Sequence, residues 1–136
     1  MKRLLKKRRR LRESIEMLRS NISDDCLFCR IAARQVPATI IAEEPGLVAF
    51  ADLHPQAPTH LLIIPTEHLA TLSDMTEAHA TLLGQALHFA SRLATQRQLA
   101  PSGYRVVINC GPQAGQSVWH LHLHLLGGRA MGWPPG

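Results

Sequence analysis

Three histidines alternate with leucines in residues 118–126, near the C-terminal end of the sequence. Side chains on a β-strand alternate between its two faces, so His120, His122 and His124 should share one face. At ~3.3 Å per residue, the backbones of the outer two stand ~13 Å apart. A zinc ion with Zn–N bonds of about 2.0–2.1 Å could take two neighbours of this row, but hardly all three. The three histidines are therefore expected to have different roles. One enzymatic interpretation is a hydrolytic zinc site in which two neighbouring histidines bind the ion.

The loop before this row has the composition of an anion-binding site. Residues 109–117 read Asn-Cys-Gly-Pro-Gln-Ala-Gly-Gln-Ser. Glycines allow backbone N–H groups to approach an anion closely, and the amide and hydroxyl side chains add further hydrogen-bonding groups. A neutral imidazole, which predominates at pH 7 when its pKa is about 6.5, also has a lone pair for attack on phosphorus. Together, the loop and the histidines predict chemistry on a phosphate group.

Cys26 and Cys29 form a CxxC motif in a sequence of three cysteines, a number that cannot form a closed set of disulfides. The N-terminal residues have no apolar segment typical of a secretion signal. A reducing, cytoplasmic location is therefore expected, in which CxxC indicates a metal ligand pair or a redox pair.

The basic charge is concentrated in an N-terminal arm, which we place at residues 1–23. Residues 1–20 hold nine Lys/Arg and two Glu, hence +7, whereas the other 116 residues hold six Arg and eight acids, hence −2. Apolar residues recur at helical spacing through the arm, at Leu4, Leu11, Ile15, Leu18 and Ile22. Such a helix could pack on its own domain, lie on an anionic membrane, contact nucleic acid, or simply be a solvated extension. We assign the arm no function.

The length of 136 residues and an apolar fraction of 46% fit one globular domain and exclude wholesale disorder. No apolar run approaches the ~20 residues that span a bilayer. A short helix is expected at 26–33 and one long helix from Asp74 and Glu77, a helix-start pattern, to about residue 100. Five strands are expected, at residues 39–42, 47–51, 60–65, 104–109 and 118–126. Their short connections predict an α+β domain on an antiparallel sheet.

Residues 115–126 (GQSVWHLHLHLL) resemble the signature of the histidine-triad (HIT) superfamily. Residues 52–60, 103–109 and 127–136 resemble its Hint branch of purine nucleoside phosphoramidases, so the likeness covers about residues 24–136. The resemblance implies a HIT-like fold, a five-stranded antiparallel sheet with helices. It also implies a homodimer in which two sheets join into a continuous sheet of ten strands.

The resemblance assigns catalytic roles to four residues. His122 would be the nucleophile that forms a nucleotidyl-histidine, and His124 would donate to the phosphate oxygens. Ser117 would hydrogen-bond to the leaving group, and His60 would support the histidine network. Asn109 and the backbone amides of Gly115, Gln116 and Ser117 would hold the phosphate.

The nucleoside-binding residues follow from the same resemblance. Asp52 corresponds to the ribose ligand, and the C-terminal residues 133–136 correspond to a tail that reaches the partner subunit's site, unless they form a solvent-exposed end. The apolar base slot would be formed by side chains whose alternative role is simple core packing, namely Leu27, Phe28, Ile31, Phe50 and Leu53.

Some members of the superfamily combine CxxC with two histidines, and the matching set here is Cys26, Cys29, His68 and His120. Such a Cys₂His₂ set suits a structural zinc ion that is not needed for chemistry. A redox role for CxxC remains the alternative. Cys110 is expected to be a small buried residue, and His54, His79 and His88 are expected to be ordinary polar or surface residues.

The favoured function is hydrolysis of the P–N bond in amines linked to AMP or GMP. A dinucleoside polyphosphate hydrolase is a second possibility, against which Ser117 and the C-terminal tail argue. A nucleotide-binding or scaffold protein without turnover, with the basic arm on nucleic acid, is a third.

Overall fold

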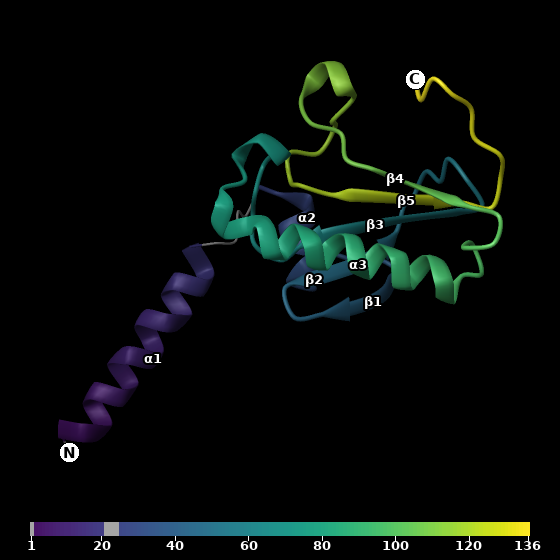
Figure 1. Cartoon of the computed structure of the whole chain (residues 1–136). Helices are drawn as coiled ribbons and strands as arrows, with labels where there is room; N and C mark the ends of the chain where they lie inside the picture. The colour runs from purple at the N-terminus through teal and green to yellow at the C-terminus, as the bar shows by residue number, and fades with distance from the viewer. Residues whose placement is uncertain (1, 21–24) are drawn as a thin grey trace.

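A five-stranded antiparallel sheet forms the centre of the protein, in a computed structural model that describes residues 2–20 and 25–136 (Figure 1). Of residues 2, 3 and 14–20 only the backbone is described. The elements in chain order are α1 (Lys2–Ser20), α2 (Leu27–Ala32), β1 (Ile40–Glu44), β2 (Leu47–Ala51), β3 (Thr59–Pro65), η1 (Leu72–Asp74), η2 (Glu77–His79), α3 (Ala80–Gln96), β4 (Tyr104–Val107), η3 (Pro112–Ala114) and β5 (Leu123–Gly127). The expected fold class is confirmed.

The strands lie in the order β1-β2-β3-β5-β4, so the last strand of the chain lies between two earlier ones. His124 on β5 pairs with Leu62 of β3 on one side and with Val107 of β4 on the other. This central position gives β5 hydrogen-bonded neighbours on both edges. A histidine carried by β5 is therefore held by a rigid backbone.

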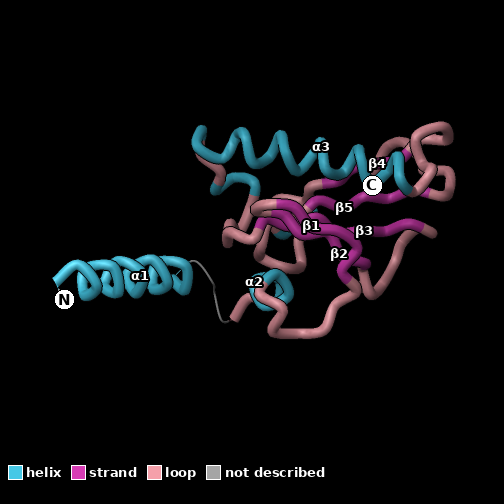
Figure 2. The backbone as a smooth tube through the Cα atoms, turned by 90° about the horizontal axis from the view of Figure 1, so that it is seen from below, coloured by secondary structure: helices cyan, strands magenta, loops and turns pink. Residues whose placement is uncertain are grey.

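The two helices of the domain cover opposite faces of the sheet (Figure 2). α3 packs its Phe89, Ala90 and Leu93 against buried residues such as Ile63 and Leu125. The smaller α2 covers the other face with a second apolar cluster, which comprises Phe28, Ile31, Val48, Phe50, Leu62 and Ile64. Burying each large apolar side chain contributes ~1.5–3 kcal/mol. The apolar packing thus fixes α2 on the sheet face opposite the long helix.

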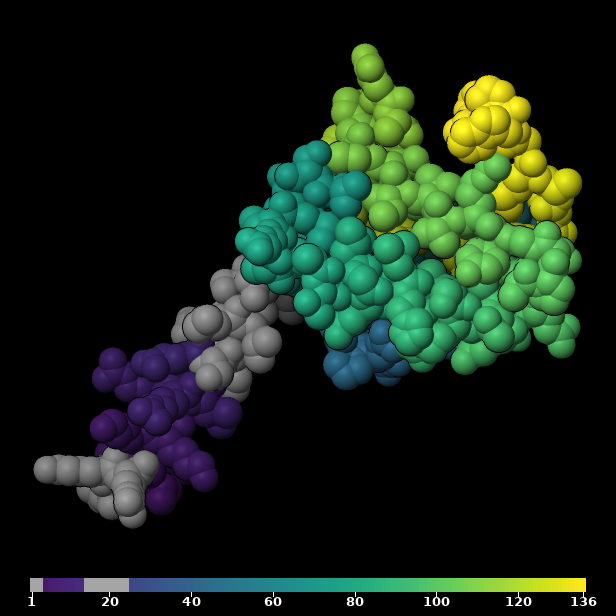
Figure 3. All heavy atoms as spheres, in the orientation of Figure 1, coloured from purple at the N-terminus to yellow at the C-terminus, as the bar shows by residue number. Residues whose placement is uncertain are grey.

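α1 projects away from the domain (Figures 1 and 3). Leu4, Leu5 and Leu11 are 64%, 59% and 62% exposed, so the described part of the apolar stripe does not pack on the sheet. The side chains of Ile15 and Leu18 are not described, and Ile22 and the expected boundary after residue 23 lie outside the described residues. Among the described residues, no helix combines the length and hydropathy needed to cross a membrane.

The long helix begins later and ends earlier than predicted. Asp74 accepts from the backbone of Thr71 in a capping box of η1, and Glu77 begins η2, so α3 starts only at Ala80. At the other end, Leu99 N–H donates to Ala94 O (2.9 Å) and Gln98 has φ of 60°. This Schellman-type end stops the helix at Gln96.

The predicted strand over residues 118–126 is wrong for its first part, because β5 begins at Leu123. Its ladder with β3 ends at the pair Ile63–Leu123, shortly before Pro65 closes β3. Proline lacks the N–H that a continued ladder requires. β4 is also shorter than predicted and ends at Val107. His120 and His122 therefore precede the strand and can point in different directions.

Candidate active site and metal centre

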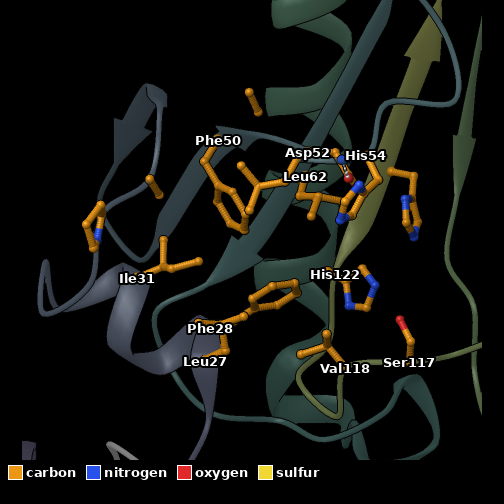
Figure 4. Close-up of a pocket in the computed structure, with 15 residues that line it drawn as sticks. Leu27, Phe28, Ile31, Phe50, Asp52, His54, Leu62, Ser117, Val118 and His122 are labelled. Atoms are coloured by element: carbon orange, nitrogen blue, oxygen red, sulfur yellow. Dashed lines mark hydrogen bonds between the residues drawn. The ribbon is translucent and has the colours of Figure 1, made fainter.

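A pocket opens between α2, the end of β2 and the segment that leads into β5 (Figure 4). One wall is apolar and comprises Leu27, Phe28, Ile31, Pro37, Ala38, Phe50, Leu62 and Val118. The other carries polar groups, from Asp52, His54, Ser117, His122 and His124. An apolar slot that ends at several converging polar groups is typical of a small-molecule site.

His122 has its two ring nitrogens in different environments. Its Nδ1 lies 2.6 Å from the carbonyl oxygen of His120, and a carbonyl can only accept a hydrogen bond. Nδ1 must therefore carry the proton, which leaves the lone pair of the neutral ring on Nε2. The side chain is buried and lines the pocket beside Ser117 (Figure 4). The ring is thus prepared to act as a nucleophile through Nε2.

A hydrogen-bond relay sets the tautomer of His124. The backbone N–H of Gln56 donates to His60 Nδ1 (3.0 Å), so a neutral His60 carries its proton on Nε2. That proton is donated to His124 Nδ1 (2.8 Å), and the neutral His124 therefore has its N–H at Nε2. The His124 ring lies 5.0 Å from the His122 ring, centre to centre. His124 can then donate a hydrogen bond to a group placed beside His122.

Burial keeps both rings of the relay neutral. It lowers the pKa of His124 to about 4, with smaller contributions from His122 and His60. Burial also lowers the pKa of His60, although the nearby Asp52 carboxylate opposes this shift. Both rings are therefore uncharged at neutral pH, and the proton positions of the relay are well defined.

Asp52 lies at the start of the loop between β2 and β3 and lines the pocket. Its Oδ1 accepts from the backbone N–H of His54 (2.8 Å), and its Oδ2 lies 3.4 Å from His60 Nε2. Asp52, His60 and His124 lie close enough to suggest a metal site. The proton on His60 Nε2 argues against this, because a metal needs a lone pair at that atom. The adjoining Leu53 is 86% exposed at the rim of the pocket.

The glycine-containing loop is held by the side chain of Gln116. Its Oε1 accepts from Gly111 N–H (2.9 Å), and its Nε2 donates to the carbonyls of Ala70 (2.8 Å) and Val118 (3.1 Å). Gly111 and Gly115 have φ of 91° and 84°, which glycine adopts without strain. The loop is therefore braced from within by a buried amide.

Two of the amides expected to hold phosphate already donate within this loop. Gly115 N–H donates to Pro112 O and Gln116 N–H to Gly111 O, each at 3.1 Å. Asn109 lies in a separate hollow that it shares with C-terminal residues such as Pro134 and Gly136. Of the loop residues that we expected at the phosphate, only Ser117 lines the pocket with His122 and His124.

Sequence reasoning missed part of the pocket lining, namely Pro37, Ala38, Ala51, His54, Leu62 and Val118. Two of these had a detectable signal. Val118 directly follows Ser117, and Leu62 lies on the predicted buried strand. Leu62 stands opposite His124 in the sheet, which only the strand register reveals.

Cys26, Cys29, His68 and His120 converge as expected for a metal site. His120 Nδ1 lies 3.3 Å from Cys26 Sγ, 3.4 Å from Cys29 Sγ and 3.2 Å from His68 Nδ1. Ligand atoms around a tetrahedral zinc with bonds of about 2.0–2.3 Å stand roughly 3.3–3.8 Å apart. His120 Nε2 donates to Pro65 O (2.8 Å), which leaves its Nδ1 lone pair for a metal. The geometry and the donor set both fit a closed tetrahedral site.

The remaining cysteine and histidines differ in their surroundings. Cys110 is only half-buried, contrary to expectation, and a hydrogen bond with Ser73 Oγ (3.2 Å) lowers the pKa of its thiol. His54 and His88 are exposed, as expected. His79 is half-buried and accepts from Thr76 N–H (2.9 Å) through Nδ1, so it stabilises the start of η2.

Comparison with known proteins identifies the family. The HIT domain model matches residues 33–131, and the chain belongs to this family. The expected membership of the histidine-triad superfamily is thereby confirmed, and the resemblance to its Hint branch is confirmed by a relative named HINT1.

Two similar sequences and one similar crystal structure illustrate what the chain resembles. The 14 kDa zinc-binding protein of Zea mays is 48% identical over 81% of this chain and 87% of its own length. Adenylylsulfatase HINT1 of Arabidopsis thaliana is 46% identical over 81% of this chain and 76% of its own. The crystal structure of a HIT family hydrolase from Legionella pneumophila has 51% identity and a TM-score of 0.81, over 82% of this chain and 100% of that one.

Proposed function

We propose that the protein is a nucleotide hydrolase that cleaves the P–N bond of AMP- or GMP-linked amines through a nucleotidyl-histidine intermediate. The main support for this proposal is the hydrogen bond that His122 Nδ1–H donates to the carbonyl of His120, because it leaves Nε2 as the reactive atom. The hydrolases among the related proteins support the same class of reaction.

The first step is attack by His122 Nε2 on the α-phosphorus. The Nε2–P bond forms, the P–N bond breaks, and the ring gains positive charge that the His120 carbonyl stabilises through the Nδ1–H. His124 donates its Nε2–H as a hydrogen bond to a phosphate oxygen. The hydroxyl of Ser117 gives its proton to the departing amine and takes a proton from solvent water in return. Water then attacks phosphorus, the Nε2–P bond breaks and the water gives up a proton to solvent, which releases the nucleotide and restores neutral His122.

The nucleoside occupies the apolar slot. The base lies between the side chains of Leu27, Phe28, Ile31, Phe50 and Leu53, and the Asp52 carboxylate accepts hydrogen bonds from the ribose hydroxyls. A ribose diol offers two donors to this carboxylate, and deoxyribose offers one. Ribonucleotides should therefore be preferred.

We further propose that Cys26, Cys29, His68 and His120 hold a structural zinc ion, which their geometry and the zinc-binding relative support. A closed Cys₂His₂ set has no open position for substrate, so the zinc takes no part in the chemistry. A reducing cytoplasmic location would keep both thiols able to bind it. The sheet has two edge strands, β1 and β4, and a second copy that pairs along one of them would complete the expected homodimer.

The central test replaces the proposed nucleophile. His122→Ala should abolish hydrolysis of adenosine phosphoramidate but retain AMP binding, because it removes the attacking ring and leaves the base slot and Asp52 in place. Turnover is measured by release of AMP, and binding by titration calorimetry. His88→Ala, which changes an exposed histidine on α3, serves as the control with full activity. Full turnover by His122→Ala would refute the mechanism.

Adenylyl sulfate is a second candidate substrate, because one relative is named an adenylylsulfatase. It would present the same adenylyl group with a different leaving group. Comparing kcat/KM for adenosine phosphoramidate, adenylyl sulfate and diadenosine polyphosphate separates these activities. No turnover of any of them, with AMP still bound, would favour a nucleotide-binding protein without catalysis.

A further inference from the structure

α2 takes part in both sites. Cys26, its N-cap, and Cys29 contribute two of the four candidate metal ligands, while Phe28 and Ile31 line the pocket. The helix has six residues, and isolated helices shorter than ~12–15 residues are marginal in water. Its position therefore depends on what it is attached to, namely the apolar cluster on one side and the ligand cluster on the other.

The opposite wall of the pocket is also tied to the ligand cluster. His120 supplies Nδ1 to the cluster, while its carbonyl oxygen holds Nδ1–H of His122 at 2.6 Å. Ser117 and Val118 line the pocket, and the same two residues line the hollow beside Cys26 and His68. His120, Ser117 and Val118 thus connect the ligand cluster with the His122 side of the pocket.

Phe28 connects the two walls (Figure 4). Its ring meets the His120 ring edge-on at 6.0 Å and the His122 ring at 5.2 Å, between centres. One aromatic side chain therefore contacts a candidate metal ligand, the proposed nucleophile and the base slot.

We propose that a metal ion at Cys26, Cys29, His68 and His120 positions both walls of the nucleotide pocket, so that metal and nucleotide strengthen each other's binding. This inference rests on the proposed nucleotide-binding function. Without the metal, α2 keeps its apolar contacts but loses the attachment at its N-cap and at Cys29. Only a fraction of the molecules then has the apolar slot in its binding-competent conformation, which lowers the apparent affinity for nucleotide.

Thermodynamic linkage makes the proposal quantitative. If zinc raises the affinity for AMP by some factor, AMP must raise the affinity for zinc by the same factor, and typical coupling factors are about 5–150. The test uses the full chain with its thiols reduced. Zinc affinity is measured by competition with a chromogenic chelator, with and without saturating AMP. AMP affinity is measured by calorimetry on the zinc-loaded and zinc-free chain.

We expect AMP to tighten zinc binding at least fivefold, and zinc to tighten AMP binding by an equal factor. Phe28→Leu keeps an apolar residue but removes the ring edges between the two histidines, so it should shrink both factors together. The matched variant Leu53→Ala changes the exposed rim of the slot on the loop after β2. It should weaken AMP binding equally with and without zinc, leaving the factor unchanged.

The outcomes separate this inference from the proposed function. If the zinc-loaded chain does not bind AMP, the proposed function is wrong. If AMP binds but zinc affinity is unchanged, the coupling is wrong and the function stands. Failure to bind zinc overturns the inference. So does loss of the sheet signal in circular dichroism of the zinc-free chain, because the coupling would then report global unfolding.

Discussion

At the scale of single residues, hydrogen bonds decide which nitrogen of each histidine is available. His120, His122 and His124 are alternate residues of one sequence motif, yet each has a different acceptor or donor at its second nitrogen. The partners are the carbonyl of Pro65, the carbonyl of His120 and the ring of His60. The same side chain thereby becomes a candidate metal ligand, a candidate nucleophile and a candidate donor.

The buried relay predicts how stability depends on pH. The pKa of His124 is about 4 in the folded protein but about 6.5 in the unfolded chain, so between these values only the unfolded chain binds the proton. Acidification from pH 6.5 towards pH 4 should therefore lower the free energy of unfolding.

Urea unfolding at pH 7 and pH 5 tests this effect. In His124→Asn the loss between the two pH values should be smaller than in the wild-type chain, because the titrating group is gone. Acid release of metal affects both proteins alike, because His124 is not one of the candidate metal ligands. An equal loss in the two would show that His124 does not carry it.

At the scale of elements, the glycine-containing loop and the start of β5 are organised by packing that no local pattern reveals. Gln116 has the sequence character of a polar loop residue, yet the residue is only 7% exposed and its side chain braces the loop through three hydrogen bonds. β5 starts late because its neighbour β3 ends at Pro65. Both features place Ser117 and His122 side by side at the pocket.

Gln116→Ala should therefore destabilise the protein by about 1–3 kcal/mol, the cost of leaving buried partners without hydrogen bonds. Gln113→Ala, at an exposed position of the same loop, should change the free energy of unfolding by under about 0.5 kcal/mol. Urea unfolding of both variants provides the measurement. Equal effects would mean that the Gln116 amide does not brace the loop.

At the scale of the whole molecule, the site belongs to the domain and the arm stands apart. All residues that line the pocket lie between positions 27 and 124 of the sequence, whereas Leu4 and Leu11 of α1 are exposed. The match to the family model also begins only at residue 33. The described leucines of α1 are thus exposed and lie outside the residues that match the family model.

Deletion of residues 1–20 should leave kcat/KM for adenosine phosphoramidate unchanged, since the pocket lacks any contribution from the described side chains of the arm. Steady-state kinetics of the truncated and full chains, at matched concentrations, check this expectation. A tenfold loss would mean that the arm takes part in the site.

The sequence by itself determined the α+β class, the types of elements along the chain and part of the site, including the four candidate metal ligands. Apolar periodicity is local, and short motifs such as HLHLHLL and CxxC carry their chemistry in residue type and spacing. Only the tertiary structure decided which ring nitrogen of each histidine is reactive, which loop amides are already used, and where β5 begins. These depend on partners such as the carbonyl of Pro65, the carbonyl of Ala70 and the ring of His60, which lie 55, 46 and 64 residues along the chain from the residues they contact. A local pattern contains no information about them.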